Sequence, residues 1–190
     1  FIFCFNSFFL PKNNVALILG DNFFYGQSLK KKLIEHKKHK KGAKVLLHKV
    51  SNPQDYGVAK LSNNNKIISI KEKPKTFISD KAITGLYYFD KKVIEYTKKL
   101  KPSKRKELEI VDLLNIYRKK NRLKADFIGR GGAWLDTGTI DDFYKTSAFV
   151  EAIENRQGLK IACIEEIAFR NRWINSKNIK NAIKFYGNCK

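Results

Sequence analysis

Apolar runs and amphipathic stretches alternate along most of the chain. Residues 15–19 form a continuous apolar run that ends in a Gly-Asp-Asn turn, a pattern typical of a buried parallel strand leading into a loop. Between residues 26 and 40, apolar side chains recur every three or four positions among lysines, which predicts an amphipathic surface helix. Residues 45–47 predict the start of a second strand.

The middle of the chain predicts a hairpin and a helix start. Residues 58–61 and 67–70 are predicted to be two strands that join through an Asn-rich turn. Asp90 is placed to cap a helix over residues 91–100, because its carboxylate can accept hydrogen bonds from first-turn amides. The other elements predicted in this region are strands at residues 82–89, 125–128 and 133–135 and a helix over about residues 108–120.

The C-terminal part predicts helices alone. Thr139 and Asp142 form a T-x-x-D start signal for a long helix, and further helices are predicted over residues 161–173 and 179–185. Strands that alternate with helices, followed by helices alone, predict an α/β sheet over residues 1–139 with a helical extension over residues 140–190.

Charge is the most unusual feature of the composition. The net charge is +21, which by itself suggests a module that binds nucleic acid. Only seven of the basic residues are arginines, whereas lysine, asparagine and isoleucine are abundant, as an AT-rich genome favours. Readers of nucleic acid rely on arginine for bidentate contacts, so we expect no nucleic-acid partner, although that alternative stays open. No run approaches about 18 apolar residues, so we expect no membrane partner.

The cysteines and histidines show no metal-ligand spacing. Three cysteines are typical of reduced thiols in a cytoplasmic protein, and Cys163 lies in an apolar run that predicts a core position. His36, His39 and His48 lie in or near a Lys-rich stretch and are expected to be solvated. The first ten residues are apolar without the flanks of a signal peptide, and the chain contains no methionine, so we expect a fragment.

Two aspartates follow predicted strands. Asp21 and Asp136 each come after an apolar run, where α/β sheets place their ligands. Mg²⁺ takes hard oxygen ligands and keeps several waters, so two carboxylates plus substrate phosphates would suffice to hold it. An aspartate after a glycine, as at Asp21, is also typical of a simple turn.

A carboxylate and an ammonium group stand side by side at another predicted strand end. Glu72 and Lys73 would point to opposite faces of a regular strand, but Pro74 supports a break at this position. The carboxylate can accept from sugar hydroxyls while the ammonium neutralises a phosphate. Gly57 would let a backbone amide approach a ligand, or would serve a bend. A charged surface loop is the alternative for Glu72 and Lys73.

Taken together, seven segments resemble the glucose-1-phosphate thymidylyltransferases in order and approximate spacing. The resemblance covers about residues 15–175, and WLDTGT and RQGLKIACIEEIA are similar to the bacterial short form in particular. The segments are LILGDNFFYG, NPQDYGV, KEKPK, AITGLYYFD, ELEIVDLLNIY, GRGGAWLDTGT and RQGLKIACIEEIAFRN.

The resemblance implies a Rossmann-like, GT-A-like nucleotidyltransferase with a mixed sheet. It implies that dTTP and glucose 1-phosphate combine to dTDP-glucose and pyrophosphate with Mg²⁺, for dTDP-rhamnose and cell-surface polysaccharide synthesis. By position, Asp21 and Asp136 match the metal ligands, and Lys73 faces the sugar phosphate. The remaining matches are substrate contacts: Gly57, Glu72 and the strand Ile83, Thr84 and Gly85, with Tyr56 and Trp134 as pocket walls, core packing being the alternative for Trp134.

The chain also departs from the family pattern. The family usually has an acidic residue at Lys71, a glycine at Lys106 and a bulkier residue at Gly132. The family's Gly-rich nucleotide loop with its arginine is not found, so we expect an N-terminally truncated chain that is inactive alone. Base choice depends on that loop, so UTP or CTP stay open as alternatives to dTTP. A non-catalytic remnant that binds a sugar nucleotide or regulates an intact enzyme also stays open.

The C-terminal helices carry a second expectation from the resemblance. Glu166 and Arg170 are spaced i, i+4 and share a helix face, which is typical of a solvated ion pair. In the family this annex forms subunit contacts and a regulatory site for a deoxysugar nucleotide. We therefore expect the intact protein to be a homotetramer in which these two residues are regulatory.

Overall fold

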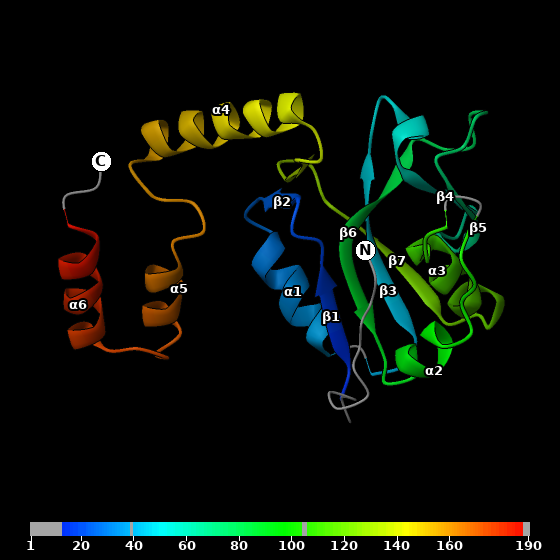
Figure 1. Ribbon diagram of the computed structural model, residues 1–190, viewed down its shortest axis with the longest axis horizontal. Coiled ribbons are helices and arrows are strands. Elements are labelled where there is room, and N and C mark those ends of the chain that lie inside the picture. The colour runs from blue at the N-terminus through cyan, green and yellow to red at the C-terminus, as the bar shows by residue number, and fades with distance from the viewer. Residues whose placement is uncertain (1–12, 39, 104–105, 188–190) are drawn as a thin grey trace. The chain divides into compact units, whose positions relative to one another are not determined.

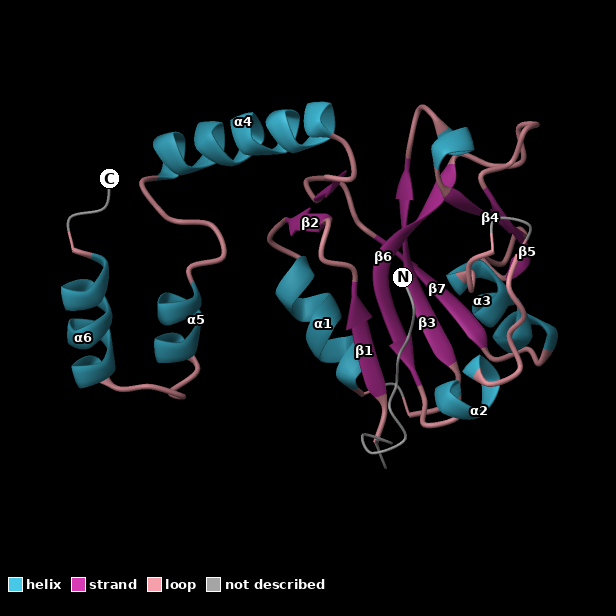
Figure 2. Ribbon diagram, in the orientation of Figure 1, coloured by secondary structure: helices cyan, strands magenta, loops and turns pink. Residues whose placement is uncertain are grey.

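The computed structural model describes residues 13–38, 40–103 and 106–187. The chain separates into two compact units, residues 1–138 and 139–190 (Figure 1). The first unit holds every strand in the described residues, and the second holds helices only, which Figure 2 shows by colour. The predicted α/β class with a helical C-terminal part is confirmed.

A mixed six-stranded sheet forms the first unit. Its strand order is β5-β4-β6-β3-β7, with β1 paired to β6 as a branch off this path. β3 runs parallel to β7, whereas β6 is antiparallel to β1, β3 and β4. The strands are β1 (Val15–Ile18), β3 (Ala43–Lys49), β4 (Gly57–Leu61), β5 (Ile67–Glu72), β6 (Lys81–Phe89) and β7 (Leu123–Phe127).

A two-stranded ribbon and three α-helices complete this unit. β2 (Asn22–Tyr25) pairs antiparallel with β8 (Ala133–Asp136). The helices are α1 (Leu29–Lys37), α2 (Val93–Thr97) and α3 (Ile110–Lys119), and a 3-10 turn covers Pro53–Asp55.

Helix α3 supplies one wall of the core. Its buried residues recur at helical spacing and belong to the same apolar cluster as Val45 and Leu47 of β3 and Phe89 of β6. At about 25 cal/mol per Å² of buried apolar surface, such packing is the main source of stability in a unit of this size. The buried residues of α3 are Val111, Leu113, Leu114 and Tyr117.

Asp90 has a different role from the one predicted. Helix α2 begins two residues later than expected, with Lys92 at its N-cap. The Asp90 side chain is buried and accepts from the backbone N–H of Gly42, from the Tyr117 hydroxyl and from the backbone N–H of Lys92. It therefore joins three segments rather than capping a helix, because a buried carboxylate needs several donors.

Strand β1 differs from the buried parallel strand that its apolar run predicted. It is antiparallel to β6, and Ile18 is 58% exposed. Within the described residues β1 pairs with a single strand, β6. Because successive side chains of a strand point to opposite faces, some side chains of β1 stay accessible to solvent. An apolar run alone does not distinguish these two environments.

His36 is buried, which corrects the expectation that it is solvated. It is 1% exposed on α1, its Nε2 lies 3.1 Å from Asp126 Oδ2, and its ring meets Tyr88 edge-on. His48 is partly buried, and His39 lies outside the described residues. Lys32 and Lys44 also pair with Asp126, so the helix is tied to β7 through one carboxylate.

The second unit has three helices: α4 (Ile140–Gln157), α5 (Ile164–Arg170) and α6 (Ser176–Tyr186). Thr139 caps α4 by accepting from the backbone N–H of Asp142, as predicted. Helix α5 is shorter than the predicted helix over residues 161–173, since Ala162 has a positive φ of 54°. Cys163 is the N-cap of α5 and partly exposed, so its expected core position is wrong. No helix in the described residues could span a membrane.

Candidate functional site

Asp21 and Asp136 come together at the ribbon of β2 and β8. Asn22 pairs with Asp136 in the ladder, so Asp21 is the next residue beyond that pair. The carbonyl of Asp21 accepts from the Thr137 backbone N–H at 2.7 Å and from the Thr137 hydroxyl at 2.9 Å. Two residues that are 115 positions apart are thereby fixed on adjacent chain segments.

The Asn22 side chain connects this pair to the large sheet. Its Oδ1 accepts from the backbone N–H of Gly85 at 2.8 Å and from the indole N–H of Trp134 at 2.6 Å. Its Nδ2 donates to Asp21 Oδ1 at 2.8 Å. One amide therefore orients an aspartate, a tryptophan and the β6 backbone, and a fully satisfied network of this kind is rigid.

Glu72 and Gly57 form the second part of the site. They are directly opposite in the β4–β5 ladder, and a Cβ at Gly57 would lie 3.0 Å from Glu72 Oε2. Strand β5 ends at Glu72, and the next residue, Lys73, has a φ of 39° and donates its backbone N–H to Tyr56 O. The predicted break in the strand is present. Non-glycine residues in this backbone region are uncommon and cluster at functional sites.

The charges of three carboxylates of the predicted site act on one buried phenol. Burial raises the pKa of the Tyr87 hydroxyl, and the negative charges of Glu72, Asp21 and Asp136 raise it further. The structure therefore brings together the two predicted metal ligands and the predicted sugar ligand. A neutral Tyr87 adds no further negative charge to this acidic cluster.

Aromatic rings form one side of the cluster. The rings of Tyr56 and Trp134 meet edge-on with centroids 5.2 Å apart, and His48 approaches Trp134 at 6.1 Å. Trp134 is 8% exposed, so it packs in the interior and orients Asn22 through its indole N–H. Burial lowers the pKa of His48, which favours a neutral ring.

The three residues of the strand predicted to contact the hexose differ in their surroundings. Ile83 is 7% exposed and belongs to the apolar core. Thr84 is fully buried, and its hydroxyl donates to the Leu46 carbonyl, so it stabilises the sheet. Gly85 lies against Asn22, where a Cβ would come within 2.5 Å of the amide. Of these three residues, Gly85 is therefore the one in direct contact with the cluster.

The donor set fits a Mg²⁺ ion that is shared with a substrate. In the part of the chain that the structure describes, no group of three His, Cys, Asp or Glu side chains could hold a metal. Asp21, in the turn before β2, and Asp136, at the end of β8, supply two carboxylates on adjacent chain segments. Mg²⁺ commonly binds proteins through one or two carboxylates and takes its remaining oxygens from water and phosphate.

Two departures from the family pattern have a structural explanation. Lys106 has a φ of 60°, a backbone region that glycine adopts more readily. At Gly132 a Cβ would lie 2.6 Å from the Ile128 side chain, so Ile128 fills the space that a larger residue would need. Lys71 is exposed on β5.

Asn22 and Tyr87 were not identified from the sequence. Asn22 directly follows Asp21, but its three partners come from β6, β8 and the preceding turn, and no local pattern reveals them. Tyr87 lies in an apolar strand and has the pattern of a core residue.

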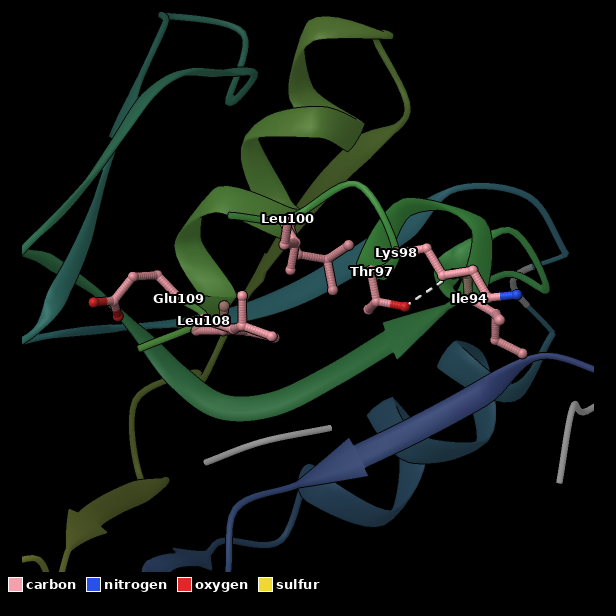
Figure 3. Close-up of a pocket in the computed structure, with 8 residues that line it drawn as sticks. Ile94, Thr97, Lys98, Leu100, Leu108 and Glu109 are labelled. Atoms are coloured by element: carbon pink, nitrogen blue, oxygen red, sulfur yellow. Dashed lines mark hydrogen bonds between the residues drawn. The ribbon is translucent and has the colours of Figure 1, made fainter. Parts of the chain in front are cut away.

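Another cavity, of about 180 Å³, lies between α2 and the start of α3 (Figure 3). Its lining is mostly aliphatic. The Thr97 hydroxyl donates to the Ile94 carbonyl, and Glu109 accepts from the Ser103 hydroxyl. These two polar groups are engaged with the protein, and Lys98 adds a single charged side chain to the otherwise aliphatic lining.

In the second unit, Glu166 and Arg170 form the ion pair that their spacing predicted. Arg170 Nη2 lies 2.6 Å from Glu166 Oε1, with the arginine side chain 72% exposed. Such an exposed pair contributes little to stability, about 0.3–0.5 kcal/mol at i, i+4 spacing. Glu166 also lines an open groove between α5 and α6.

Comparisons with known proteins identify the family of this chain. Residues 3–153 match the model of the nucleotidyl transferase family. The chain is 44% identical over 172 residues to the glucose-1-phosphate thymidylyltransferase of Neisseria meningitidis serogroup A, covering 90% of this chain and 60% of that protein. It is 43% identical to the Xanthomonas campestris enzyme of the same name, covering 87% and 56%. The chain thus spans less than two thirds of these relatives.

Solved structures give the same result for the fold. A Bacillus anthracis protein described as a glucose-1-phosphate thymidylyltransferase, crystallised with sucrose, superposes with a TM-score of 0.66 at 42% identity, covering 75% of this chain and 56% of that one. A UDP-glucose pyrophosphorylase complexed with UDP-glucose superposes at 0.63 with 23% identity, over 74% and 57%, which shows a shared fold alone.

Proposed function

This chain belongs to the nucleotidyl transferase family, and on that premise we propose that its acidic cluster is the sugar-phosphate half of a glucose-1-phosphate thymidylyltransferase site. The observation that carries the proposal is that Asn22 links Asp21 to Gly85 and pairs with Asp136 in the ladder, while Glu72 lies against Gly57. Three carboxylates suit a substrate that has hydroxyl groups and that binds together with a metal ion.

The proposed reaction joins glucose 1-phosphate to dTTP. A phosphate oxygen of the sugar attacks the α-phosphorus of the nucleotide, the new P–O bond forms, and the bond to pyrophosphate breaks. A sugar phosphate is already an anion at neutral pH, so positioning and charge neutralisation are the main tasks of the protein. A Mg²⁺ ion held by Asp21 and Asp136 would supply positive charge to the phosphates.

Other residues of this chain would bind the sugar and neutralise the charge of the phosphates. Glu72 would accept hydrogen bonds from the sugar hydroxyls, and Lys73 would offset the repulsion between the two anionic substrates. Gly57, which leaves room for the Glu72 carboxylate, and Gly85 would let the sugar approach the backbone. Tyr56 would form the wall of the sugar pocket, with the buried Trp134 ring packed edge-on against it.

The second unit would form the subunit contacts and a regulatory site. We propose a homotetramer of the intact protein, in the cytoplasm, that serves dTDP-rhamnose and polysaccharide synthesis. Glu166 and Arg170 would contribute to a regulatory site for the end product. Supporting this are the exposed ion pair and the groove beside it.

A titration of the 190-residue chain tests the sugar-phosphate site. We expect glucose 1-phosphate to bind, and Lys73→Ala to weaken it by about 10- to 150-fold, because a charge-assisted hydrogen bond contributes about 1.5–3 kcal/mol. Lys75→Ala removes an equally exposed lysine two residues away and serves as the control. Equal losses in both variants would contradict the assignment of Lys73.

Turnover is tested separately, by pyrophosphate release from dTTP, glucose 1-phosphate and Mg²⁺. Where activity is present, Asp136→Asn should abolish it while leaving the fold intact, since Asp136 ends a strand outside the apolar core. The matched control is Asp112→Asn, at an exposed position on α3. Activity of Asp136→Asn within about tenfold of the parent would remove Asp136 from the metal site.

A further inference from the structure

Three separate segments of the first unit meet at the amino-terminal ends of β3 and β7. Ala43 pairs with Leu123 in one ladder and with Phe89 in the other. The Ala43 backbone N–H donates to the Arg122 carbonyl at 2.8 Å, and the Gly42 N–H donates to Asp90 at 2.6 Å. The turn before β3, the turn after β6 and the turn before β7 are thus fixed side by side, next to α2 (Figure 1).

These turns and the end of α3 carry a dense set of cations. Nine basic residues lie on them, all exposed, and we name this set the basic pole. Eight are lysines and one is arginine. The members are Lys38, Lys40, Lys41, Lys91, Lys92, Lys119, Lys120, Arg122 and Lys124.

Few acidic groups offset the basic pole. Asp90 is buried among its own donors, and exposed Glu95 pairs with Lys99. Asp126 is held by Lys32, Lys44 and His36. Across the described residues, no ion pair involves a member of the pole, whereas the second unit forms pairs such as Lys160–Glu154. The charge of Glu95 acts on Lys92 and Lys120 but does not balance nine cations, so an external anion would stabilise this surface.

We propose that the basic pole docks the protein onto an anionic phospholipid surface. Each lysine near an anionic membrane surface adds its own attraction to the lipid headgroups, so no shaped pocket is needed. The pole is built from turns and helix ends, and lysine is a strongly hydrated point charge that suits such contact. None of the large exposed apolar side chains of the described residues belongs to it, so the binding is electrostatic, peripheral and reversible.

A nucleic-acid partner is less well supported by the same residues. Binding to unpaired strands uses exposed aromatic rings for base stacking. The Tyr96 ring, which lies beneath Lys99 and Lys120 of this region, is 3% exposed. Base readout in a groove favours arginine, and Arg122 is the pole's single arginine.

Docking through the pole leaves the acidic cluster accessible. β3 and β7 are parallel, and Gly85, which contacts Asn22 of the cluster, lies in β6 between the partners of Val45 and Leu47, level with the middle of β3. The pole lies at the amino ends of β3 and β7. The sequence did not reveal this arrangement, because the lysines are spread along the chain and only the sheet topology gathers them.

Vesicle co-sedimentation of the 190-residue chain tests the proposal. We expect binding to vesicles of equal parts phosphatidylglycerol and phosphatidylcholine, weak binding to phosphatidylcholine alone, and loss of binding as salt is raised. The variant K40Q/K41Q/K91Q removes three charges of the pole and should lower the partition coefficient by at least about tenfold.

The control K60Q/K66Q/K75Q removes three exposed lysines of the first unit outside the pole and should lower binding less than about threefold. Circular dichroism checks that both variants fold. Equal losses in the two variants would overturn the proposal, as would equal binding to neutral vesicles. Tighter binding to a DNA duplex than to anionic vesicles at equal phosphate concentration would also overturn it and assign the pole to nucleic acid.

Discussion

At the scale of single residues, the site depends on positions where a side chain is small or missing. Gly57 leaves room for the Glu72 carboxylate, and Gly85 leaves room for the Asn22 amide. Asn22 in turn fixes Asp21 and Trp134. A small change at either glycine should therefore propagate to a charged group, which a change on the protein surface would not do.

Gly85→Ala tests this dependence. The new methyl group would start 2.5 Å from the Asn22 side chain, so the amide must move and its hydrogen bonds must lengthen. We expect a loss of about 1–3 kcal/mol in the free energy of unfolding, the usual cost of overpacking. Gly129→Ala is the control, because a Cβ there meets nothing within 4 Å. Urea unfolding curves that show equal effects for the two variants would contradict this view of Gly85.

Lys106 gives a prediction of the opposite sign. Its φ of 60° strains a side chain with a Cβ, whereas glycine adopts this conformation readily. We expect Lys106→Gly to raise the free energy of unfolding by about 0.5–1 kcal/mol. Lys101→Gly, at an exposed neighbouring position without a positive φ, should lower it instead. Denaturant unfolding curves of the two variants measure both free energies. A free energy of unfolding lower for Lys106→Gly than for the wild type would contradict the strain at Lys106.

At the scale of elements, the attachment of α1 to the sheet depends on one buried titrating pair. Burial lowers the pKa of His36 from its ordinary value of 6.5, against a raising effect of Asp126, and Lys44 and Lys32 lower it further. His36 Nδ1 has no hydrogen-bond partner in the described residues. A proton there would place a buried N–H without an acceptor. Although burial opposes it, hydrogen bonds from His36 and Lys32 lower the pKa of Asp126 to about 2.

The sign of the resulting pH dependence follows from linkage. The folded state binds a proton at His36 less readily than the unfolded state, so the stability from neutral His36 is complete above pH 6.5 and is lost as the pH falls below it. We expect the wild type to lose more unfolding free energy between neutral and mildly acidic pH than His36→Gln, which cannot titrate. Parallel pH profiles of the two proteins would contradict this role.

The helices and strands could be predicted from the sequence more completely than the partners against which they pack. The hairpin of β4 and β5, strand β6 and helix α3 follow local periodicity and turn chemistry, and they are present. The antiparallel pairing of β1, the burial of His36 and the short α5 depend on partners distant in sequence or on the positive φ of Ala162. Asp136 ends β8 as its apolar run predicted, and Asp21 lies in the turn between β1 and β2; their metal-binding role stays a prediction. Asn22 binds through contacts that no local pattern encodes.

At the scale of the whole molecule, the second unit exposes more apolar surface than a monomer needs. Its α4, α5 and α6 present large side chains to solvent, and an open groove of about 720 Å³ runs between α5 and α6. Exposed apolar surface in this amount is typical of a protein–protein interface. The most exposed of these side chains are Ile140 (91%), Phe185 (84%), Ile164 (76%) and Trp173 (75%).

We therefore expect self-association through the second unit, giving a tetramer for the intact protein. Light scattering at micromolar concentration should report a mass above that of the monomer, and I164D should lower it, because a carboxylate in an apolar interface must be desolvated. I68D introduces the same charge at a 46% exposed position of β5 in the first unit and should leave the mass unchanged. A monomer in all three proteins would contradict the assembly. An oligomer whose activity ignores dTDP-rhamnose would retain the assembly and remove the regulatory role of Glu166 and Arg170.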